Sequence, residues 1–381
     1  MLVCWQDRDR RRLDVNVCLV LGAGATLANA KHFRPKRMRN SYPPLDTTFF
    51  EVVASRRIQL PANLQTYLRE VVGVDSSLEA LRARRMEEVF KDAFFDLHNE
   101  ERGESAYMAY VELVDLYVRV LRETTNWLCE ERRSGAPVGR LLAAAAKAAD
   151  VVTVVTFNHD LVIENEIFRR GALRRRWCLD HGYGSLGGLL HPVTPHGRTI
   201  PMFQRHREGN CDHDRPITVL KLHGSLNWVV KLSGVIPTAN FLRGEGGRKP
   251  VHLLPRRQLF GRDVIVRTGK GRTRWRTWPV VVPPVYAKQA LFDSAVQVVR
   301  DDAWAALESA DRVVFYGYSL PMIDVEAEKL FERSLAKNRS IEWLDVIDPS
   351  AAVAARYAGL APAIPIRWFP SAESFFEAKT L

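Results

Sequence analysis

The strongest constraint on the fold is an apolar strand that runs directly into a glycine turn. Residues 15–21, VNVCLVL, form a mostly apolar run with β-branched valines, of the kind that parallel sheets bury on both faces. The run ends at Gly22-Ala23-Gly24, a turn that lets backbone N–H groups approach a pyrophosphate. The full dinucleotide fingerprint is not met, because Leu27 stands at the third glycine position and no clear acidic strand end follows. A hydride-transferring dehydrogenase is therefore not favoured, and a tight turn without a ligand stays open.

Six further short apolar runs predict strands. They cover residues 151–157, 217–224, 278–284, 311–319, 341–349 and 366–370. Helical patterns lie between several of them, notably over residues 286–309 and 324–337. This alternation predicts an α/β fold with a Rossmann-like, mainly parallel sheet.

The stretch between the first two strands has a different pattern. Apolar positions recur at helical spacing in residues 77–97 and 107–128, and an alanine-rich helix is predicted over residues 138–149. Residues 31–44 predict a loop. We expect a single domain over residues 1–381, with a helical insertion at 46–148 and loop-rich insertions at 178–216 and 231–277.

Composition excludes several classes of protein. The 381 residues are 46% hydrophobic and 26% charged, values typical of a globular chain rather than a disordered or collagen-like one. No apolar run approaches the roughly 18–20 residues that cross a bilayer, and the N-terminus has no signal core. The five cysteines are widely spaced without a CxxC, which disfavours a disulfide framework or a zinc ribbon. We therefore expect a protein of a reducing cytoplasm that does not bind a membrane.

Positive charge is concentrated in two segments. The formal net charge is +11; residues 1–40 hold nine Lys or Arg against three Asp or Glu, and residues 240–276 hold eleven against two. Such patches suggest contact with DNA or with an acidic protein surface. An arginine-rich surface without a partner is the plain alternative.

Polar side chains follow four of the predicted strands. They form the groups Asn158-His159-Asp160, His223-Gly224-Ser225, Gly317-Tyr318-Ser319 and Asp348-Pro349. Each group alone has an ordinary structural explanation, such as capping of the next helix. Ligands of open α/β sheets bind at the carboxyl ends of the strands, however, and four such ends together indicate a site.

Five motifs, in this order and spacing, resemble the sirtuin-like superfamily. They are GAGAT, TFNHD, KLHGSLNW, FYGYSLP and VIDP, and PPLDTTFF at residues 43–50 fits the same pattern. The resemblance covers residues 15 to 370 and is nearest to the bacterial sirtuin-like domains that hydrolyse NAD in anti-phage defence. It implies a Rossmann-like fold and NAD as the substrate.

The resemblance also implies which residues bind NAD. The pyrophosphate side would be held by Gly22, Ala23, Gly24 and Thr26, and the adenosine side by Gly317, Ser319 and Asp348. Asp348 would take a ribose hydroxyl, and Asp46 would lie near the loop on the nicotinamide side.

Three further residues would be catalytic by the same resemblance. Asn158 would contact the nicotinamide ribose and order the attacking water, and Asp160 would face the nicotinamide amide. His223 would act on the ribose hydroxyl or on the water, a task that suits an imidazole near neutral pH.

The sequence departs from protein-deacylating sirtuins in two places. Their four-cysteine zinc module follows the catalytic His-Gly pair, but no cysteine occurs after Cys211 here. The loop after Gly24 also has no plain match to their acid–arginine signature. Both departures favour water as the acceptor over an acylated protein.

A bound metal is a separate alternative. Five histidines (His181, His191, His196, His206 and His213) lie near Cys178 and Cys211, and both residue types bind zinc. Their spacing is irregular, so we expect a loop beside the site and no metal.

The leading hypothesis is thus an NAD glycohydrolase that acts as a toxic effector in bacterial anti-phage defence, through abortive infection. Such an activity needs restraint, which predicts a homo-oligomer and a separate activator such as a HerA-like ATPase, with DNA contact through the basic segments. The alternatives are an NAD-dependent protein deacylase and a non-catalytic subunit that binds NAD, ADP-ribose or DNA.

Overall fold

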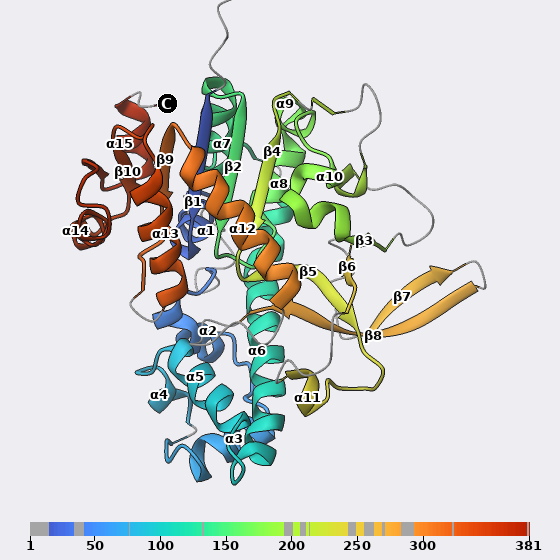
Figure 1. Ribbon diagram of the computed structural model, residues 1–381. Helices are drawn as coiled ribbons and strands as arrows, with labels where there is room; N and C mark the ends of the chain where they lie inside the picture. The colour runs from blue at the N-terminus through green and yellow to red at the C-terminus, as the bar shows by residue number, and fades with distance from the viewer. Residues whose placement is uncertain are drawn as a thin grey trace, which may run out of the picture.

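The computed structural model describes residues 15–33, 42–75, 77–131, 133–193, 201–205, 211–212, 214–242, 249–254, 263–268, 271–282, 293–321, 324–378 and 381. Most of the basic residues of segments 1–40 and 240–276 therefore lie outside the described part. None of the helices within these ranges combines the length and the apolar character that crossing a membrane requires. Figure 1 shows the arrangement of the elements.

The larger sheet is parallel throughout and has six strands in the order β11-β10-β9-β1-β2-β4. Their bounds are β1 (Asn16–Leu21), β2 (Val151–Thr156), β4 (Ile217–Lys221), β9 (Arg312–Tyr316), β10 (Leu344–Ile347) and β11 (Ile366–Phe369). Counted along the chain, this is the 3-2-1-4-5-6 order of dinucleotide-binding folds, with its reversal between β1 and β9. The predicted α/β, Rossmann-like fold is confirmed, and six of the seven predicted strands form this sheet.

The strands belong in this sheet because they are apolar on both faces. Leu19 of β1 lies in register with Val154 of β2 on one side and Val314 of β9 on the other. All three side chains are fully buried. β1 is thus a central strand, and the turn that follows it lies in the middle of the sheet's carboxyl edge.

Helices cover both faces of this sheet. α1 (Ala23–Phe33) packs against α7 (Pro137–Ala148), which contacts β2. On the opposite face, α12 (Asp293–Ser309) contacts β1 and β4 and lies beside α13 (Val325–Lys337), as Figure 1 shows. Residues 31–33, predicted as loop, form the last turn of α1, because Phe33 is buried with Ala30 in a small apolar cluster.

A body of helices stands at the carboxyl edge of the sheet, below it in Figure 1. It consists of η1 (Asp46–Thr48), α2 (Phe49–Ser55), α3 (Ala62–Glu70), α4 (Leu78–Leu81), α5 (Met86–Leu97) and α6 (Gly103–Glu130). Tyr110 and Tyr117 of α6 pack edge-to-face against Phe90 of α5. The predicted helical insertion at 46–148 includes α7. In the structure, however, α7 packs against α1 and β2 in the helical layer that covers the large sheet.

A second, smaller sheet was not predicted. It has the order β3-β6-β5-β8-β7, with bounds β3 (His191–Pro192), β5 (Gly224–Lys231), β6 (Val251–Leu253), β7 (Asp263–Thr268) and β8 (Gly271–Val281). All its pairs are antiparallel except β3 with β6. Residues 278–281 of the run predicted as a strand at 278–284 belong to β8, and residues 283–284 lie outside the described part.

Residues 231–277, which were predicted to be rich in loops, contribute three strands to this second sheet. They carry β6, β7 and most of β8, and the β7–β8 hairpin projects away from the body in Figure 1. A short apolar run does not show which sheet it will join, so the sequence could not separate β8 from the parallel strands.

Shorter elements complete the described chain. They are α8 (Val162–Arg169), α9 (Gly171–Arg174), α10 (Leu179–Gly182), η2 (Gly184–Leu189), η4 (Pro201–Phe203), α11 (Ala239–Leu242), α14 (Ala351–Leu360) and α15 (Ala372–Glu377).

Candidate functional site

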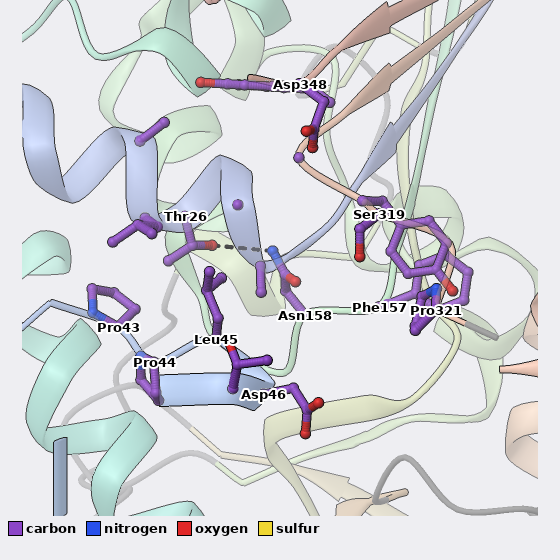
Figure 2. Close-up of a pocket in the computed structure, with 18 of the residues that line it drawn as sticks. Thr26, Pro43, Pro44, Leu45, Asp46, Phe157, Asn158, Ser319, Pro321 and Asp348 are labelled. Carbon is purple, nitrogen blue, oxygen red and sulfur yellow. Dashed lines mark hydrogen bonds between the residues drawn. The ribbon is translucent and has the colours of Figure 1, made fainter. Parts of the chain in front are cut away.

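A cavity of about 1210 Å³ opens where the strand order reverses. Its walls come from the loops after β1, β2, β4, β9 and β10 and from η1, α5 and α6 of the helical body. Ten of the eleven predicted site residues line it: Ala23, Gly24, Thr26, Asp46, Asn158, Asp160, His223, Gly317, Ser319 and Asp348. The eleventh, Gly22, does not line the cavity but accepts a hydrogen bond from Asn158. Figure 2 shows Asp46, Asn158, Ser319 and Asp348 around this space.

The glycine turn after β1 is packed against the end of β9. The Gly24 N–H donates to the carbonyl of Gly317 at 2.9 Å. A Cβ on Gly22 would lie 2.4 Å from that same carbonyl oxygen, and one on Gly317 would lie 2.3 Å from the Ala25 nitrogen. The close packing of the two turns therefore requires these glycines whether or not a ligand binds. For this reason the glycine turn alone does not establish a phosphate site.

Gly317→Ala is expected to destabilise the fold. Gly317 has a φ of +61°, and the new methyl group would collide with backbone atoms of Gly24 and Ala25. Left-handed backbone and overpacking together cost about 2–5 kcal/mol of the free energy of unfolding. Urea denaturation measures the loss.

The matched control for this substitution is Gly359→Ala. Gly359 lies in α14, and a Cβ there would meet no atom within 4 Å. We expect that control to be neutral or to stabilise by about 0.5–1 kcal/mol, because alanine favours helix. Equal unfolding midpoints for Gly317→Ala and the wild type would contradict the packing described above.

Asn158 is held so that its amide oxygen is the group left for a ligand. Its Nδ2 donates to the Gly22 carbonyl at 2.8 Å and to the Thr26 hydroxyl at 3.1 Å. The backbone N–H of Asn158 donates to Thr156 Oγ1 at 3.1 Å. With both amide hydrogens directed at protein acceptors, Oδ1 can accept from a hydroxyl or a water in the cavity.

Asp160 and Thr26 belong to the same network. The Thr26 hydroxyl donates to Asp160 Oδ2 at 2.9 Å, and the Val162 N–H donates to Asp160 Oδ1 at 2.9 Å. Both carboxylate oxygens therefore support the loop that enters α8. This is a structural role of the kind that capping residues have, and Asp160 keeps a place in the cavity wall beside it.

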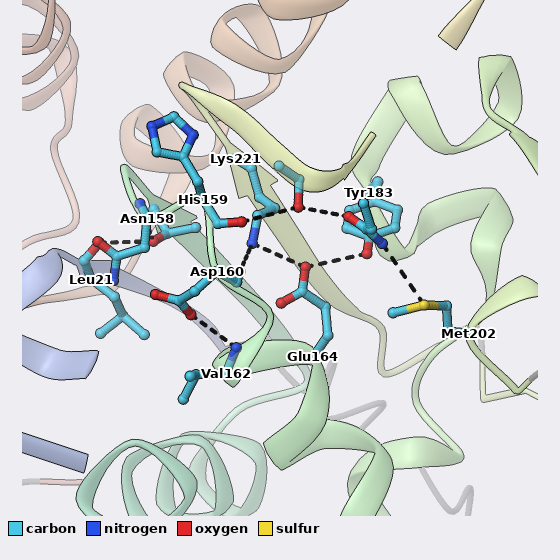
Figure 3. Close-up of polar contacts among 12 residues, drawn as sticks. Leu21, Asn158, His159, Asp160, Val162, Glu164, Tyr183, Met202 and Lys221 are labelled. Atoms are coloured by element: carbon cyan, nitrogen blue, oxygen red, sulfur yellow. Dashed lines mark hydrogen bonds and ion pairs between the residues drawn. The ribbon is translucent and has the colours of Figure 1, made fainter. Parts of the chain in front are cut away.

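A buried ion pair supports this loop from beneath. Lys221 Nζ lies 3.1 Å from Glu164 Oε1, and both side chains are almost completely buried. The same ammonium donates to the carbonyl of Asp160, and Tyr183 donates to Glu164 at 3.2 Å. Figure 3 shows Lys221 between the loop and Glu164. The sequence analysis missed this pair, although a lysine inside the apolar run 217–224 was a signal for it.

His223 stands at the turn where the chain passes from β4 into β5. Its Nε2 lies 3.6 Å from Oδ2 of Asp324, which also accepts from the Tyr318 hydroxyl at 2.8 Å. The ring packs edge-to-face on Phe157, which is stacked on Tyr318 with centroids 4.0 Å apart. His223 and Asp324 are both buried, so this carboxylate acts on the imidazole with little screening by water.

Asp324 is the main site residue that sequence analysis missed. It lies five residues after Ser319, where the chain enters α13, and it lines the cavity. A carboxylate before a helix reads as an ordinary cap. Its place beside a histidine 101 positions earlier follows only from the sheet topology, which puts the ends of β4 and β9 on one edge.

Asp46 joins the site to the helical body. Its Oδ1 accepts from the Glu87 N–H at 2.8 Å, and its Oδ2 lies 2.5 Å from Arg85 Nε. Asp46, Arg85 and Glu87 all line the cavity, together with Tyr117 of α6. Hence the helical insertion provides one wall of the site. Of the residues in this wall, the sequence analysis predicted only Asp46.

The far side of the cavity is formed by the ends of β9 and β10. Ser319 is exposed there, and Leu320 next to it has a positive φ of 49°. Burial raises the pKa of Asp348, while the Ser350 N–H and Arg356 oppose that shift. Asp348 is thus a half-buried carboxylate able to accept from a hydroxyl group.

The chain has no match among family models or curated proteins. A solved structure described as "Structural Basis for the Mechanism and Regulation of Sir2 Enzymes" is similar to it, with 12% sequence identity, 96% of this chain and 90% of that chain covered, and a TM-score of 0.35. A similarity at this score carries no argument for a shared activity.

Proposed function

We propose that the chain is an NAD glycohydrolase that splits NAD into nicotinamide and ADP-ribose. The observation that carries the proposal is that one cavity at the β1–β9 reversal is lined by the glycine turn, Asn158 and His223. Its volume of about 1210 Å³ exceeds the roughly 300–1,000 Å³ usual for drug-sized ligands, as a dinucleotide requires. The resemblance of the motifs around these residues to sirtuin-like domains supports NAD as the substrate.

The arrangement suits cleavage of a bond that leaves positive charge behind. Nicotinamide departs as a neutral base, so the site must position the ribose and water rather than supply an acid. Asn158 Oδ1 would accept from the attacking water or a ribose hydroxyl. His223 would take the proton as the water oxygen bonds to the ribose carbon, and Asp324 would stabilise the resulting imidazolium.

Several carboxylates line the cavity. Burial is the main cause that raises the pKa of Tyr117 and of Tyr318. The charges of Asp160, Glu87 and Asp46 add to the shift of Tyr117, and those of Asp324 and Glu87 add to the shift of Tyr318. Negative charge here favours both the pyridinium ring of NAD and the cationic ribose of the transition state.

A biological role is proposed from the resemblance alone. NAD loss kills a cell, so the activity fits a toxic effector of anti-phage defence in the bacterial cytoplasm. Such an effector would be restrained by self-assembly or by a separate ATPase of the HerA-like kind. Both the partner and contact with DNA rest on analogy and on the basic composition of the chain.

Asp324→Asn tests the assignment of Asp324 as a positioning residue. Loss of the charge is expected to lower kcat for nicotinamide release about 10- to 100-fold, because the imidazolium loses its partner. The pH at which kcat reaches half its maximum should also fall, since the protonated imidazole is no longer stabilised. Steady-state kinetics across pH measure both effects.

Asp301→Asn on the exposed face of α12 is the matched control and should leave kcat unchanged. A lower kcat for Asp324→Asn with an unchanged pH profile would indicate a purely structural role for Asp324.

The proposed activity is tested by chromatography of NAD incubated with the purified chain. We expect nicotinamide and ADP-ribose to form in equal amounts without any peptide, either with the chain alone or after adding a candidate ATPase. Release that requires an acyl-lysine peptide would make the protein a deacylase. No release under any of these conditions, together with salt-dependent DNA binding, would favour a binding subunit.

A further inference from the structure

Two cysteines and a histidine come together away from the cavity. The ligand atoms of Cys178, His181 and Cys211 all lie within 4.8 Å of one another. None of these residues lines the cavity. The histidines His196, His206 and His213 of the same region lie outside the described residues, and His191 is on β3.

The histidine ring lies between the two sulfur atoms. His181 Nδ1 lies 3.2 Å from Cys178 Sγ, and Nε2 lies 3.3 Å from the carbonyl of Arg176. Cys211 Sγ lies 3.6 Å from Nε2, so the two sulfurs contact different nitrogens of the ring. One ligand atom from each of the three residues nevertheless lies within 4.8 Å of the other two. Tetrahedral zinc separates its sulfur and nitrogen ligands by about 3.5–3.8 Å, so one sulfur would rotate toward the nitrogen that binds the ion.

The backbone around the three residues is held by long-range contacts. The Asp212 N–H donates to the Arg175 carbonyl at 2.8 Å, and the Leu179 N–H donates to the Gln204 carbonyl at 2.8 Å. The His181 carbonyl accepts from Thr218 of β4 at 3.1 Å. The group therefore joins the two ends of segment 178–211 beside the amino-terminal half of β4, whose other end leads to His223.

The surroundings are suited to a divalent cation. Asp180 and Asp212 follow Cys178 and Cys211 closely in the chain and carry carboxylates. A cation would displace a proton from each thiol, and two thiolates with one neutral histidine balance its two charges. The carboxylate of Asp212 or a water could fill a fourth position.

We propose that Cys178, His181 and Cys211 bind one zinc ion at a structural site. The ion ties segment 178–211 to β4 and takes no part in the reaction. This proposal revises the expectation from the sequence that the protein holds no metal. It is independent of the proposed function, because none of its ligands touches the cavity.

Metal content of the intact chain tests the proposal. The protein, expressed with zinc in the medium and dialysed, should contain about one zinc per chain by mass spectrometry. Cys178→Ser and His181→Ala should each lower that ratio at least about fivefold. Cys129→Ser, which changes a buried cysteine of α6 outside the group, is the matched control and should retain the zinc.

Cobalt binding keeps the test valid if the variants fail to fold. Cobalt(II) added to metal-stripped wild type should give the intense absorption of thiolate coordination, with one ion bound per chain. Zinc-free protein without such absorption would overturn the proposal. So would a thiol titration of the unreduced, denatured chain that finds only three of its five cysteines free and maps a disulfide to Cys178 and Cys211.

Discussion

Asn158→Ala and His223→Ala are each expected to lower kcat for nicotinamide release by about 10²–10⁴-fold. Asn158 is the residue whose remaining acceptor faces the cavity, since both its amide hydrogens are bound by Gly22 and Thr26. His223 is the imidazole that Asp324 is placed to support. Neither change should alter the far-ultraviolet circular dichroism of the chain, because both residues lie in loops between helices and strands.

The matched control for His223→Ala is His191→Ala. His191 is exposed on β3 of the second sheet and does not line the cavity. That variant should retain the wild-type rate. A His223→Ala enzyme whose kcat stayed within about threefold of wild type would exclude the imidazole as the proton acceptor.

The second large effect concerns stability. Lys221→Met is expected to lower the free energy of unfolding by about 3–5 kcal/mol, because it leaves the Glu164 carboxylate buried without its cation. The Asp160 carbonyl also loses its bond to the ammonium, so the loop that carries Asn158 should be displaced and kcat reduced. Guanidinium denaturation and the chromatographic assay measure these two effects.

Two further variants separate the ion pair from general damage. Glu164→Gln in the Lys221→Met background removes the stranded charge and should recover part of the lost stability. Lys147→Met changes an exposed lysine of α7 and should have almost no effect. A Lys221→Met protein as stable as the Lys147→Met control would show that the buried pair does not hold the loop.

The large sheet could be predicted because its signal is local. An apolar run with β-branched valines such as residues 15–21, ended by glycines, indicates a buried parallel strand without reference to the rest of the chain. Polar residues after such runs then fall on one edge of the sheet. This reasoning predicted that Gly24, Asn158, His223 and Asp348 would come together, and they line one cavity.

The remaining features depend on contacts between distant segments. Whether residues 278–281 join the parallel sheet or β8 is decided by pairing with β5, which the run itself does not encode. Asp324 looks like a helix cap until the fold brings it to His223. From the sequence, Arg85 just before α5 and Glu87 in its first turn look like exposed charges of an amphipathic helix. Only the docking of the helical body makes them part of the cavity.

Several predicted site residues also have structural tasks. The Thr26 hydroxyl and both oxygens of Asp160 take part in the network that joins the β1 turn to the β2 loop. Substitutions at these two positions are expected to lower both stability and activity, so they cannot assign a role in NAD binding. His223 is more informative, because its contacts with Asp324 and Phe157 lie outside this network. Asn158 shares the network through its bonds to Gly22 and Thr26, so the unfolding free energy of Asn158→Ala has to be measured beside its kcat.

The most direct test of the account is the crystal structure of His223→Ala soaked with NAD, in which the substrate should remain uncleaved. We predict the pyrophosphate against Gly24 at the start of α1 and the nicotinamide ribose within hydrogen-bond distance of Asn158 Oδ1. Electron density for NAD elsewhere on the molecule, or an empty cavity at an NAD concentration that saturates the wild-type enzyme, would contradict the assignment of this cavity.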